Sequence, residues 1–465
     1  MIVTIPIEIK SRELHSKLLI CYYLLKFNPR IKILLTKSSI LLDRKIKKKN
    51  LIYFEKSLSK HKIKNHKEFL KNNFIVSLDE EGPFYHWSNI LKNSRINLKI
   101  INHFNFKFFF LWGDNEKKFF KKKILNENKD KIISVGHPKF DFVKKKNHFF
   151  FQKELRIINK KYKNLIFISS SFFTDSVMDE RIYKIYLEKT QKDKKNIERF
   201  SEELKNHDEN YFNLIKLSTQ IAKKFPNHNI VFRPHPRQDI NKVKSRFIDK
   251  PKNLHIVSDF TSTPWIIASK FYIHCNCTTV HEAYFLKKNI YCSRPNLKIF
   301  AKKQLTEYGK FYRSNEKLIL DLSKKISNKK NLKKNSINQK IIKFSNGEES
   351  AKRIALNIVR CFKNIKSEIK IKEERKKRSY LNNLKYFILG NLKRLIYSKF
   401  RGLYIFLFKY SFISVKYIFT KDYKMNKISS LQKKDILDFF KKISKKENKI
   451  KCKRINENIF EIKKI

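Results

Sequence analysis

The residues best suited to chemistry stand between Asn229 and Asp239, a stretch that reads NIVFRPHPRQD. Three apolar residues predict a buried strand, and two prolines then fix φ and predict a rigid loop. The loop carries Arg233, His235-Pro236 and Arg237. A guanidinium binds phosphate oxygens in a fork, and an imidazole can protonate a leaving group that gains negative charge. We therefore expect a phosphate site, with an ordinary strand-to-loop turn as the alternative.

An acidic cluster follows another apolar run. Phe74 to Leu78 predicts a buried strand, and Asp79, Glu80, Glu81 and Gly82 come directly after it. Two carboxylates held close together raise the pKa of one of them, as general acid-base catalysis requires. A solvated acidic turn is the alternative, but this concentration of carboxylates stands in a chain with 107 Lys and Arg residues. Glu80 and Glu81 are therefore the candidate acid-base residues.

Paired hydroxyl groups form a third candidate site. Thr278 and Thr279 precede a helical run, and Glu282 lies one turn further along. Hydroxyls at the positive end of a helix suit a phosphate, and the carboxylate can accept hydrogen bonds from ribose hydroxyls. The alternative is that Thr serves only as an N-cap, since Thr is a favoured cap.

A scaffold of parallel strands is needed to bring these sites together. Short β-branched or apolar runs alternate with helical or polar stretches through most of the chain, which is typical of sheets wrapped by helices. The candidate residues follow strands, and open α/β sheets bind ligands at the carboxyl ends of their strands. We expect two doubly wound, Rossmann-like α/β domains that face a cleft. They occupy residues 1–150 and 160–362, and a basic, aromatic-rich helical extension follows over residues 363–465.

The composition restricts the class of protein. The net charge is +65, yet Lys, Ile, Asn and Phe are abundant together while only 7 Gly occur, so compositional bias explains much of the charge. A basic RNA-binding protein stays an alternative, but no recognisable module is present and no nucleic-acid partner is expected. Six cysteines without a CxxC pair indicate a reducing compartment, and Cys275 and Cys277 beside His274 and His281 read as core residues and not as metal ligands.

No secretory signal and no uncharged run long enough to span a bilayer is found in the sequence, so we expect a cytoplasmic protein. The carboxyl-terminal residues leave two interpretations open. A basic run from Lys370 to Arg378 precedes aromatic and aliphatic patches over residues 386–419. These patches either contact the inner face of an anionic membrane peripherally or pack on the second domain as a helical tail.

Several motifs resemble bacterial GT-B glycosyltransferases that use CMP-activated sugars, namely the sialyltransferases and the Kdo transferases of capsule and lipopolysaccharide assembly. Within this group the chain is similar to the surface carbohydrate biosynthesis proteins. The similarity covers about residues 1–362 and is carried by IPIEIKSREL, SLDEEG, the stretch from Leu111 to Asp114, VGHPKFD, FRPHPR and NCTTVHEA.

The resemblance implies roles for the candidate residues. His235 would contact the CMP phosphate and assist its departure, and Arg233, Pro236 and Arg237 would form the donor site around it. The remaining donor-binding residues would be Ser169, Ser170, Ser171, Thr278, Thr279 and Glu282. The acidic motif would supply either the base of an inverting transferase or the nucleophile of a retaining one.

The resemblance also implies the substrates. The donor would be a CMP-activated Kdo-like or sialic-acid-like sugar, and the acceptor a surface glycan, free or lipid-linked, with no metal ion or other cofactor. An RPHP loop also occurs in polyol-phosphate polymerases that use CDP-glycerol, so a phosphotransferase is the alternative enzyme.

Overall fold

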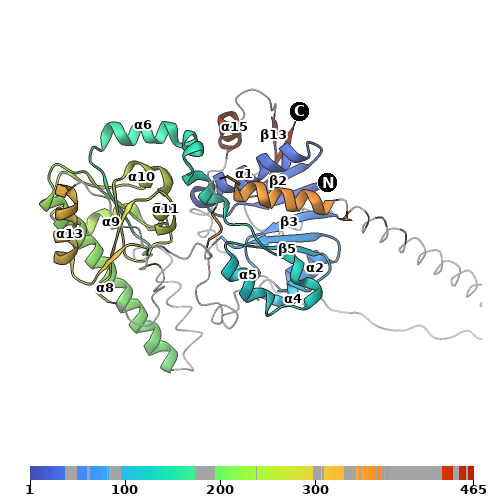
Figure 1. The fold of residues 1–465 in the computed structure, drawn as a ribbon, viewed down its shortest axis with the longest axis horizontal. Coiled ribbons are helices and arrows are strands. Elements are labelled where there is room, and N and C mark those ends of the chain that lie inside the picture. Colours follow the sequence, from blue (N-terminus) through green and yellow to red (C-terminus); the bar gives the residue numbers. More distant parts are fainter. Residues whose placement is uncertain are drawn as a thin grey trace, which may run out of the picture.

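The computed structural model describes residues 1–36, 50–59, 63–80, 82, 96–172, 194–236, 238–296, 305, 308–328, 342–344, 347–362, 364–365, 367, 370, 374, 432–443, 450–456 and 459–464. Two sheets, each covered by helices, lie side by side (Figure 1). Glu81, Arg237 and the aromatic patches over residues 386–419 lie outside the described residues.

The first sheet has the strand order β13-β14-β2-β1-β3-β4-β5-β6. Its parallel strands are β1 (Ile2–Pro6), β2 (Lys32–Thr36), β3 (Leu51–Glu55), β4 (Phe74–Leu78), β5 (Phe106–Leu111) and β6 (Ile132–Ser134). Both faces of these strands are buried, which explains their nearly continuous apolar sequences. One face packs against α1 (Lys10–Phe27), and α2 (Ile63–Leu70), α4 (Leu98–Ile101) and α5 (Asp114–Lys121) cover the other.

The second sheet has the order β12-β11-β10-β7-β8-β9, and all its strands are parallel. The strands are β7 (Ile166–Ser169), β8 (Ile230–Arg233), β9 (Leu254–Ile256), β10 (Phe271–His274), β11 (Asn289–Ser293) and β12 (Lys310–Tyr312). The helices are α6 (Gln152–Lys161), α8 (Lys194–Lys224), α9 (Ile240–Ser245), α10 (Ser262–Ala268), α11 (Val280–Phe285) and α13 (Asn315–Asn328). This is the Rossmann order, whose switch point lies between β7 and β10. The expected α/β class with two doubly wound domains is confirmed.

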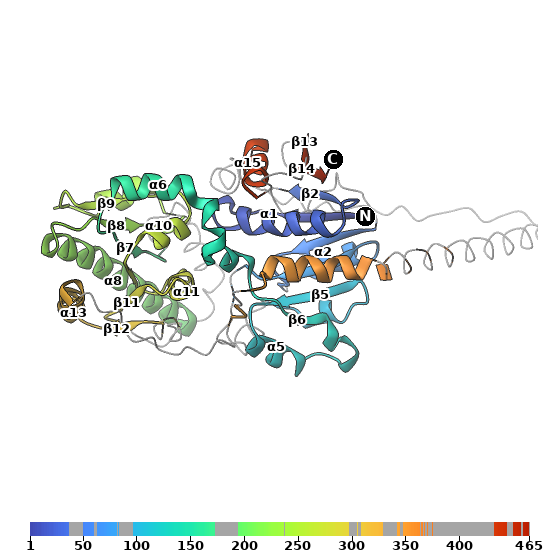
Figure 2. The same cartoon turned by 45° about the horizontal axis from the view of Figure 1, so that its top comes forward.

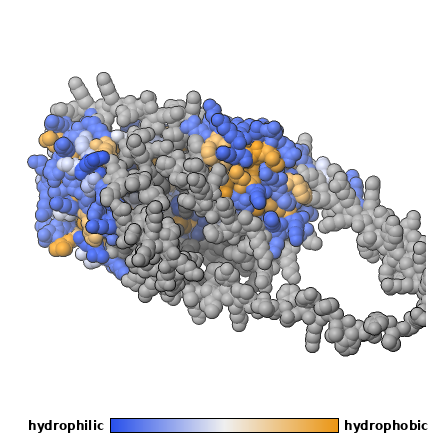
Figure 3. Space-filling view, turned by 90° about the horizontal axis from the view of Figure 1, so that it is seen from below, coloured by the Kyte–Doolittle hydropathy of each residue, from blue (hydrophilic) through white to orange (hydrophobic). Residues whose placement is uncertain are grey.

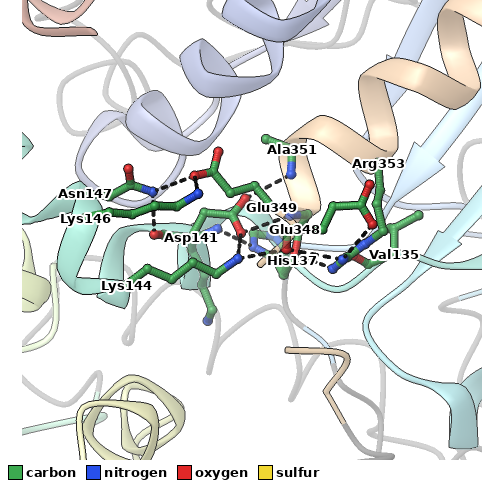
Figure 4. Close-up of polar contacts among 12 residues, drawn as sticks. Val135, His137, Asp141, Lys144, Lys146, Asn147, Glu348, Glu349, Ala351 and Arg353 are labelled. Carbon is green, nitrogen blue, oxygen red and sulfur yellow. Dashed lines mark hydrogen bonds and ion pairs between the residues drawn. The ribbon is translucent and has the colours of Figure 1, made fainter. Parts of the chain in front are cut away.

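A helix over residues 350–362 joins the core of the first domain. Its apolar side chains pack in the same cluster as α1, and the two helices run side by side (Figures 1 and 2). Asp141 in η4 (Pro138–Val143) accepts hydrogen bonds at 2.9 Å from the backbone N–H groups of Ser350 and Ala351 and so caps this helix (Figure 4). From the sequence, these residues were expected to belong to the second domain, over residues 160–362.

Gly136 makes the close approach to this segment possible. Its φ is +82°, and a Cβ there would meet the backbone oxygen of Lys343 and the hydroxyl of Ser350. Arg353 Nε donates to the backbone oxygen of Val135 at 2.8 Å (Figure 4). The VGHPKFD motif therefore anchors the returning chain as well as ending β6.

The carboxyl-terminal residues require a correction. Their described part contains α15 (Lys433–Ile443) and two strands, β13 (Ile450–Asn456) and β14 (Ile459–Lys464), so the expected purely helical extension is wrong. β14 pairs antiparallel with β2 and extends the first sheet. Phe460 and Ile462 are buried, and Glu461 between them is less so, which is the alternation of a half-buried strand. The overlooked signal was this alternation, and the edge of β2 gives it a partner.

The α15 helix packs firmly on the first domain. The ring of Phe439 stacks on Phe150 at 5.0 Å and on His15 at 5.9 Å between centroids. We expect Phe439→Ala to lower the free energy of unfolding by about 3–5 kcal/mol because it leaves a cavity. The exposed neighbour Asp438 is the matched control, and Asp438→Ala should change it by less than about 0.5 kcal/mol. Chemical denaturation measures both, and equal small effects would mean that α15 is not held by this packing.

The surface of the described residues is mixed. Seen from below, apolar side chains gather on the first domain among polar ones (Figure 3). Phe104 and Leu125 of that domain are exposed by 59% and 56%. Within the described residues, no helix combines the length and the apolar character that crossing a membrane requires.

Candidate functional site

Hydroxyl groups gather at the switch point of the second sheet. Ser169 ends β7, and its Oγ lies 3.3 Å from Thr279 Oγ1 beyond the neighbouring strand β10. Thr279 Oγ1 also lies 2.7 Å from the Tyr272 hydroxyl and 2.9 Å from Cys277 Sγ. Although Thr279 precedes α11, its side chain makes no capping hydrogen bond there. Its hydroxyl therefore belongs to a polar cluster at the carboxyl edge of the sheet, where such folds bind nucleotides.

Arg233 lies beside this cluster. It ends β8, is 8% exposed, and donates from Nη2 to the backbone oxygen of Phe260 at 2.8 Å. Its Nε has no hydrogen-bond partner among the described residues. Glu282 Oε2 accepts from Thr263 Oγ1 at 2.7 Å. Burial raises the pKa of Glu282, and the charges of Lys139 and Arg233 together with the Thr263 hydrogen bond oppose this shift.

The loop after β8 holds the other predicted donor residues. His235 is half-buried, and its backbone N–H donates to Gln238 Oε1 at 2.9 Å, while Pro236 is exposed. Ser170 is buried, and its backbone N–H donates to the backbone oxygen of Arg233 at 3.0 Å. Ser171 and Thr278 are half-buried near the same edge. Among the described residues, the predicted serines, threonines and residues of the His-Pro loop thus follow β7, β8 or β10, and Glu282 lies on α11.

Glu80 lies in a buried cluster of the first domain. Its Oε1 lies 2.5 Å from Lys17 Nζ, and its Oε2 lies 3.1 Å from His137 Nε2. Glu80 is 7% exposed, and Lys17 and His137 are 1% exposed. Glu13, one helical turn before Lys17 on α1, is also fully buried and accepts from the backbone N–H of Glu8 at 2.8 Å. Lys17 pairs with Glu80 and also acts electrostatically on Glu13, whose Oε1 lies 3.3 Å from Arg12 Nη2.

The two carboxylates have opposite pKa shifts. Burial alone would raise the pKa of Glu80, but Lys17 and His137 outweigh it and hold this pKa well below its usual range. Burial and the charge of Glu80 raise the pKa of Glu13 to about 7, against the opposing effect of Lys17. Burial lowers the pKa of His137 to about 4, so its imidazole is neutral near pH 7. Such separation is typical of carboxyl pairs with different roles: Glu80 stays ionised, and Glu13 exchanges a proton near neutrality.

The raised pKa of Glu13 predicts a pH effect on stability. Folding favours its protonated form, so this contribution is present below the ordinary pKa of 4.5 and is lost as the pH rises through about 7. His137 has the opposite sign, and its contribution is lost as the pH falls from 6.5 through about 4. We therefore compare the protein with Glu13→Gln at each pH. As the pH rises from 4.5 to 8, the unfolding free energy of Glu13→Gln should increase by up to about 3 kcal/mol relative to that of the unchanged protein. A pH-independent difference in denaturant titrations would contradict the shift.

Aromatic residues bring the two domains into contact. The ring centroid of Trp112 lies 4.6 Å from that of His137 and 5.6 Å from that of Phe140. The Nε1 of Trp112 donates to the backbone oxygen of Asp79 at 2.8 Å. The ring of Phe140 packs edge-on against two rings of α11, with centroid distances of 6.2 Å to His281 and 5.3 Å to Phe285. The cluster around Glu80 and the helix that carries Glu282 thus meet at one boundary.

Sequence reasoning missed Glu13, Lys17, His137 and Lys139 as site residues. Glu13 and Lys17 lie four residues apart on one helix and so share a face, a spacing visible in the sequence. His137 and Lys139 stand in VGHPKFD, a motif of the resemblance to which no role had been given. Their proximity to Glu80 depends on the order β4-β5-β6, which the sequence does not specify.

Comparisons with known proteins return structural likeness only. No protein-family model matches the sequence, and no curated protein does. The UDP-GlcNAc 2-epimerase of Methanocaldococcus jannaschii, solved with UDP-GlcNAc and UDP, is 16% identical, with 77% of this chain and 99% of that chain covered and a TM-score of 0.48. The Neisseria meningitidis UDP-GlcNAc 2-epimerase bound to UDP-GlcNAc is 13% identical, with 77% and 100% covered and a TM-score of 0.47. The wall teichoic acid polymerase TagF is 12% identical, with 79% and 90% covered and a TM-score of 0.42. At these values the fold assignment rests on the strand orders.

Proposed function

We propose that this chain is a glycosyltransferase that moves a sugar from a CMP-activated donor onto a surface glycan under construction. One observation carries the proposal. A polar cluster at the β7/β10 switch point, with Arg233 beside it, suits a nucleotide phosphate, and a carboxylate cluster lies across the domain boundary where a reacting sugar would stand. CDP-glycerol is the second candidate donor, since the loop that carries His235 suits either phosphate.

The proposed reaction assigns one role to each cluster. The bond between the anomeric carbon and the phosphate oxygen breaks, and CMP leaves with the electron pair. Arg233, His235 and Arg237 stabilise the charge that develops on the phosphate, and the hydroxyls of Ser169, Ser170, Ser171, Thr278 and Thr279 orient it. The acceptor hydroxyl oxygen bonds to the anomeric carbon and gives up its proton to a base.

The acidic residues are assigned by their protonation. Ionised Glu80 stabilises the positive charge that develops on the sugar, and Glu13 takes up the proton from the site near neutral pH. Glu81 stays a candidate from the sequence. Both inverting and retaining courses are compatible with an ionised carboxylate at this place.

The experiment offers three donors to the purified protein: CMP-Kdo, CMP-N-acetylneuraminic acid and CDP-glycerol. We expect CMP release from one of the two sugar donors, and unchanged release with EDTA because no metal ion takes part in the proposed reaction. Release from CDP-glycerol alone would replace the proposal with polyol-phosphate transfer. Release from none of the three, in the presence of extracted lipid-linked glycans, would contradict both.

Peripheral contact with an anionic membrane is part of the proposal, since it would bring the enzyme to a lipid-linked acceptor. We expect co-sedimentation with phosphatidylserine vesicles at low salt and a marked loss at about 0.5 M salt, where the Debye length is only several ångströms. Replacing Arg375, Lys376, Lys377 and Arg378 by Gln should weaken it further.

A double substitution in the first domain serves as the control for charge. Lys122→Gln with Lys123→Gln removes exposed lysines and should leave sedimentation unchanged. A truncation after Lys363 would not test the charge alone, because it would also remove α15, β13 and β14. Equal sedimentation of all forms, or of none, would contradict the membrane contact.

A further inference from the structure

Both ring nitrogens of His137 have a defined partner. His137 follows β6 and directly precedes η4, and its side chain is 1% exposed. The backbone N–H of Lys139 donates to its Nδ1 at 3.2 Å, and its Nε2 lies 3.1 Å from Glu80 Oε2. Because Pro138 has no N–H, the N–H of Lys139 is the first one after the histidine that can reach the ring. The His-Pro pair therefore sets up the contact at Nδ1 locally, and the fold supplies the one at Nε2.

These contacts fix the tautomer of His137. A nitrogen that accepts a hydrogen bond carries no proton, so the single proton of the neutral imidazole is on Nε2 and is donated to the carboxylate of Glu80. A proton on Nδ1 would point at the N–H of Lys139. Burial lowers the pKa of His137 to about 4, the charges of Lys139 and Lys17 act in the same direction, and Glu80 opposes them. Neither nitrogen has a free lone pair, so His137 does not serve as a base.

The carboxylate of Glu80 is held from two sides. Its Oε1 lies 2.5 Å from Nζ of Lys17, which belongs to α1, and its Oε2 accepts from His137, which follows β6. The ring of His137 is itself held, since its centroid lies 4.6 Å from that of Trp112. A carboxylate with a fixed donor on each oxygen does not turn freely. A charge fixed in this way stabilises a developing charge without having to reorganise first.

We propose that His137 is a positioning residue that holds Glu80 in one orientation through its Nε2–H, and that the N–H of Lys139 selects the tautomer this requires. The role in transfer rests on the proposed function, whereas the tautomer does not. Lys17 supplies the opposite charge, and His137 fixes the second oxygen. Loss of the His137 donor should therefore slow the step in which charge develops on the sugar and leave donor binding unchanged.

Two substitutions separate the two hydrogen bonds of the ring. In His137→Asn, the amide oxygen takes the place of Nδ1 and accepts from the N–H of Lys139, but the side chain is too short to reach Glu80. In His137→Gln, the amide nitrogen takes the place of Nε2 and donates to Glu80. His103 is the matched control, because its Nδ1 also accepts from the backbone N–H two residues later, that of Asn105, at 3.1 Å. It precedes β5, whereas Glu80 follows β4, so the two lie at opposite edges of the sheet.

Steady-state kinetics test the role in transfer, with whichever of CMP-Kdo and CMP-N-acetylneuraminic acid is the donor. We expect His137→Asn to lower kcat by about 10-fold or more, the effect of losing one hydrogen bond to a charged group, with KM for the donor within about twofold. His137→Gln should keep kcat within about fivefold of the unchanged protein, because the donor to Glu80 is restored. His103→Asn should keep it within about twofold.

NMR of protein labelled with the heavy nitrogen isotope at histidine tests the tautomer without any substrate. The histidine signal that disappears in His137→Gln should show a proton on Nε2 and none on Nδ1 between about pH 5 and 8. Circular dichroism checks that the variants are folded.

Other outcomes would overturn the inference in distinct ways. A proton on Nδ1, or on both nitrogens near neutral pH, would show that the tautomer is wrong. Unchanged kcat in His137→Asn, or equal losses in the Asn and Gln variants, would show that the hydrogen bond to Glu80 has no role in transfer, while the transferase itself would stand. Absence of transfer by the unchanged protein would contradict the proposed function and the role of His137 in it, and the spectrum would still decide the tautomer.

Discussion

Replacing Glu80 by Gln should abolish sugar transfer. The ionised carboxylate lies 2.5 Å from Lys17 and 3.1 Å from His137, and it is proposed to stabilise charge on the reacting sugar. We expect the turnover number to fall about 100-fold or more, as when one preorganised electrostatic group is removed, while CMP still binds. Steady-state kinetics and CMP titration measure the two effects separately.

Loss of stability has to be separated from loss of chemistry in this variant. Glu80→Gln removes the carboxylate that pairs with the buried ammonium of Lys17, and breaking a buried pair in this way costs about 3–5 kcal/mol. The double variant Lys17→Met with Glu80→Gln removes both charges and should recover much of that stability without recovering transfer. Recovery of transfer in the double variant would show that Glu80 serves the fold and not the reaction.

Replacing His235 by Ala should lower turnover by a similar factor, about 100-fold, because the leaving phosphate loses a donor. The side chain is half-buried in the loop after β8, so the fold should persist with a small change in unfolding free energy. His228 offers a matched control, two residues before the opposite end of β8. It is also half-buried, and His228→Ala should leave turnover within about twofold.

The kinetic parameters assign the role of His235. A fall in kcat with unchanged KM indicates an interaction made in the transition state, whereas a rise in KM alone indicates ground-state binding of the donor. Near-normal kcat in His235→Ala would remove this loop from the chemistry. Equal losses in His235→Ala and His228→Ala would point to a general effect on β8.

Sequence patterns predicted the two sheets because buried parallel strands are nearly uniform apolar runs. Ile230–Arg233 and Phe74–Leu78 were recognised in this way, together with the polar residues that follow them. Strand alternation of Phe460 and Ile462 was visible too, but its meaning depends on the free edge of β2, more than 400 residues earlier in the chain. Short strands that complete a distant sheet carry no local sign of their partner.

The candidate site was predicted only in part, because some of its residues follow recognisable strands and others come from distant elements. Residues directly after strands, such as Arg233 and Ser169, lie where an open sheet places its ligands. Glu80 was expected to share its site with Glu81, whereas the structure gives it Lys17 and His137 from distant elements. The pKa of a buried carboxyl depends on such partners, so spacing along the chain did not reveal which carboxyl is ionised.

The central claim is that a cytidine nucleotide binds at the carboxyl ends of β7 and β10. Thermal unfolding with and without CMP tests it most directly, because a ligand at 100 times its Kd stabilises the fold by about 2.7 kcal/mol. We predict that CMP raises the Tm of the unchanged protein, that Thr279→Val abolishes the increase, and that the destabilised Phe439→Ala keeps it. An increase of the same size in Thr279→Val, or none in the unchanged protein, would contradict the claim.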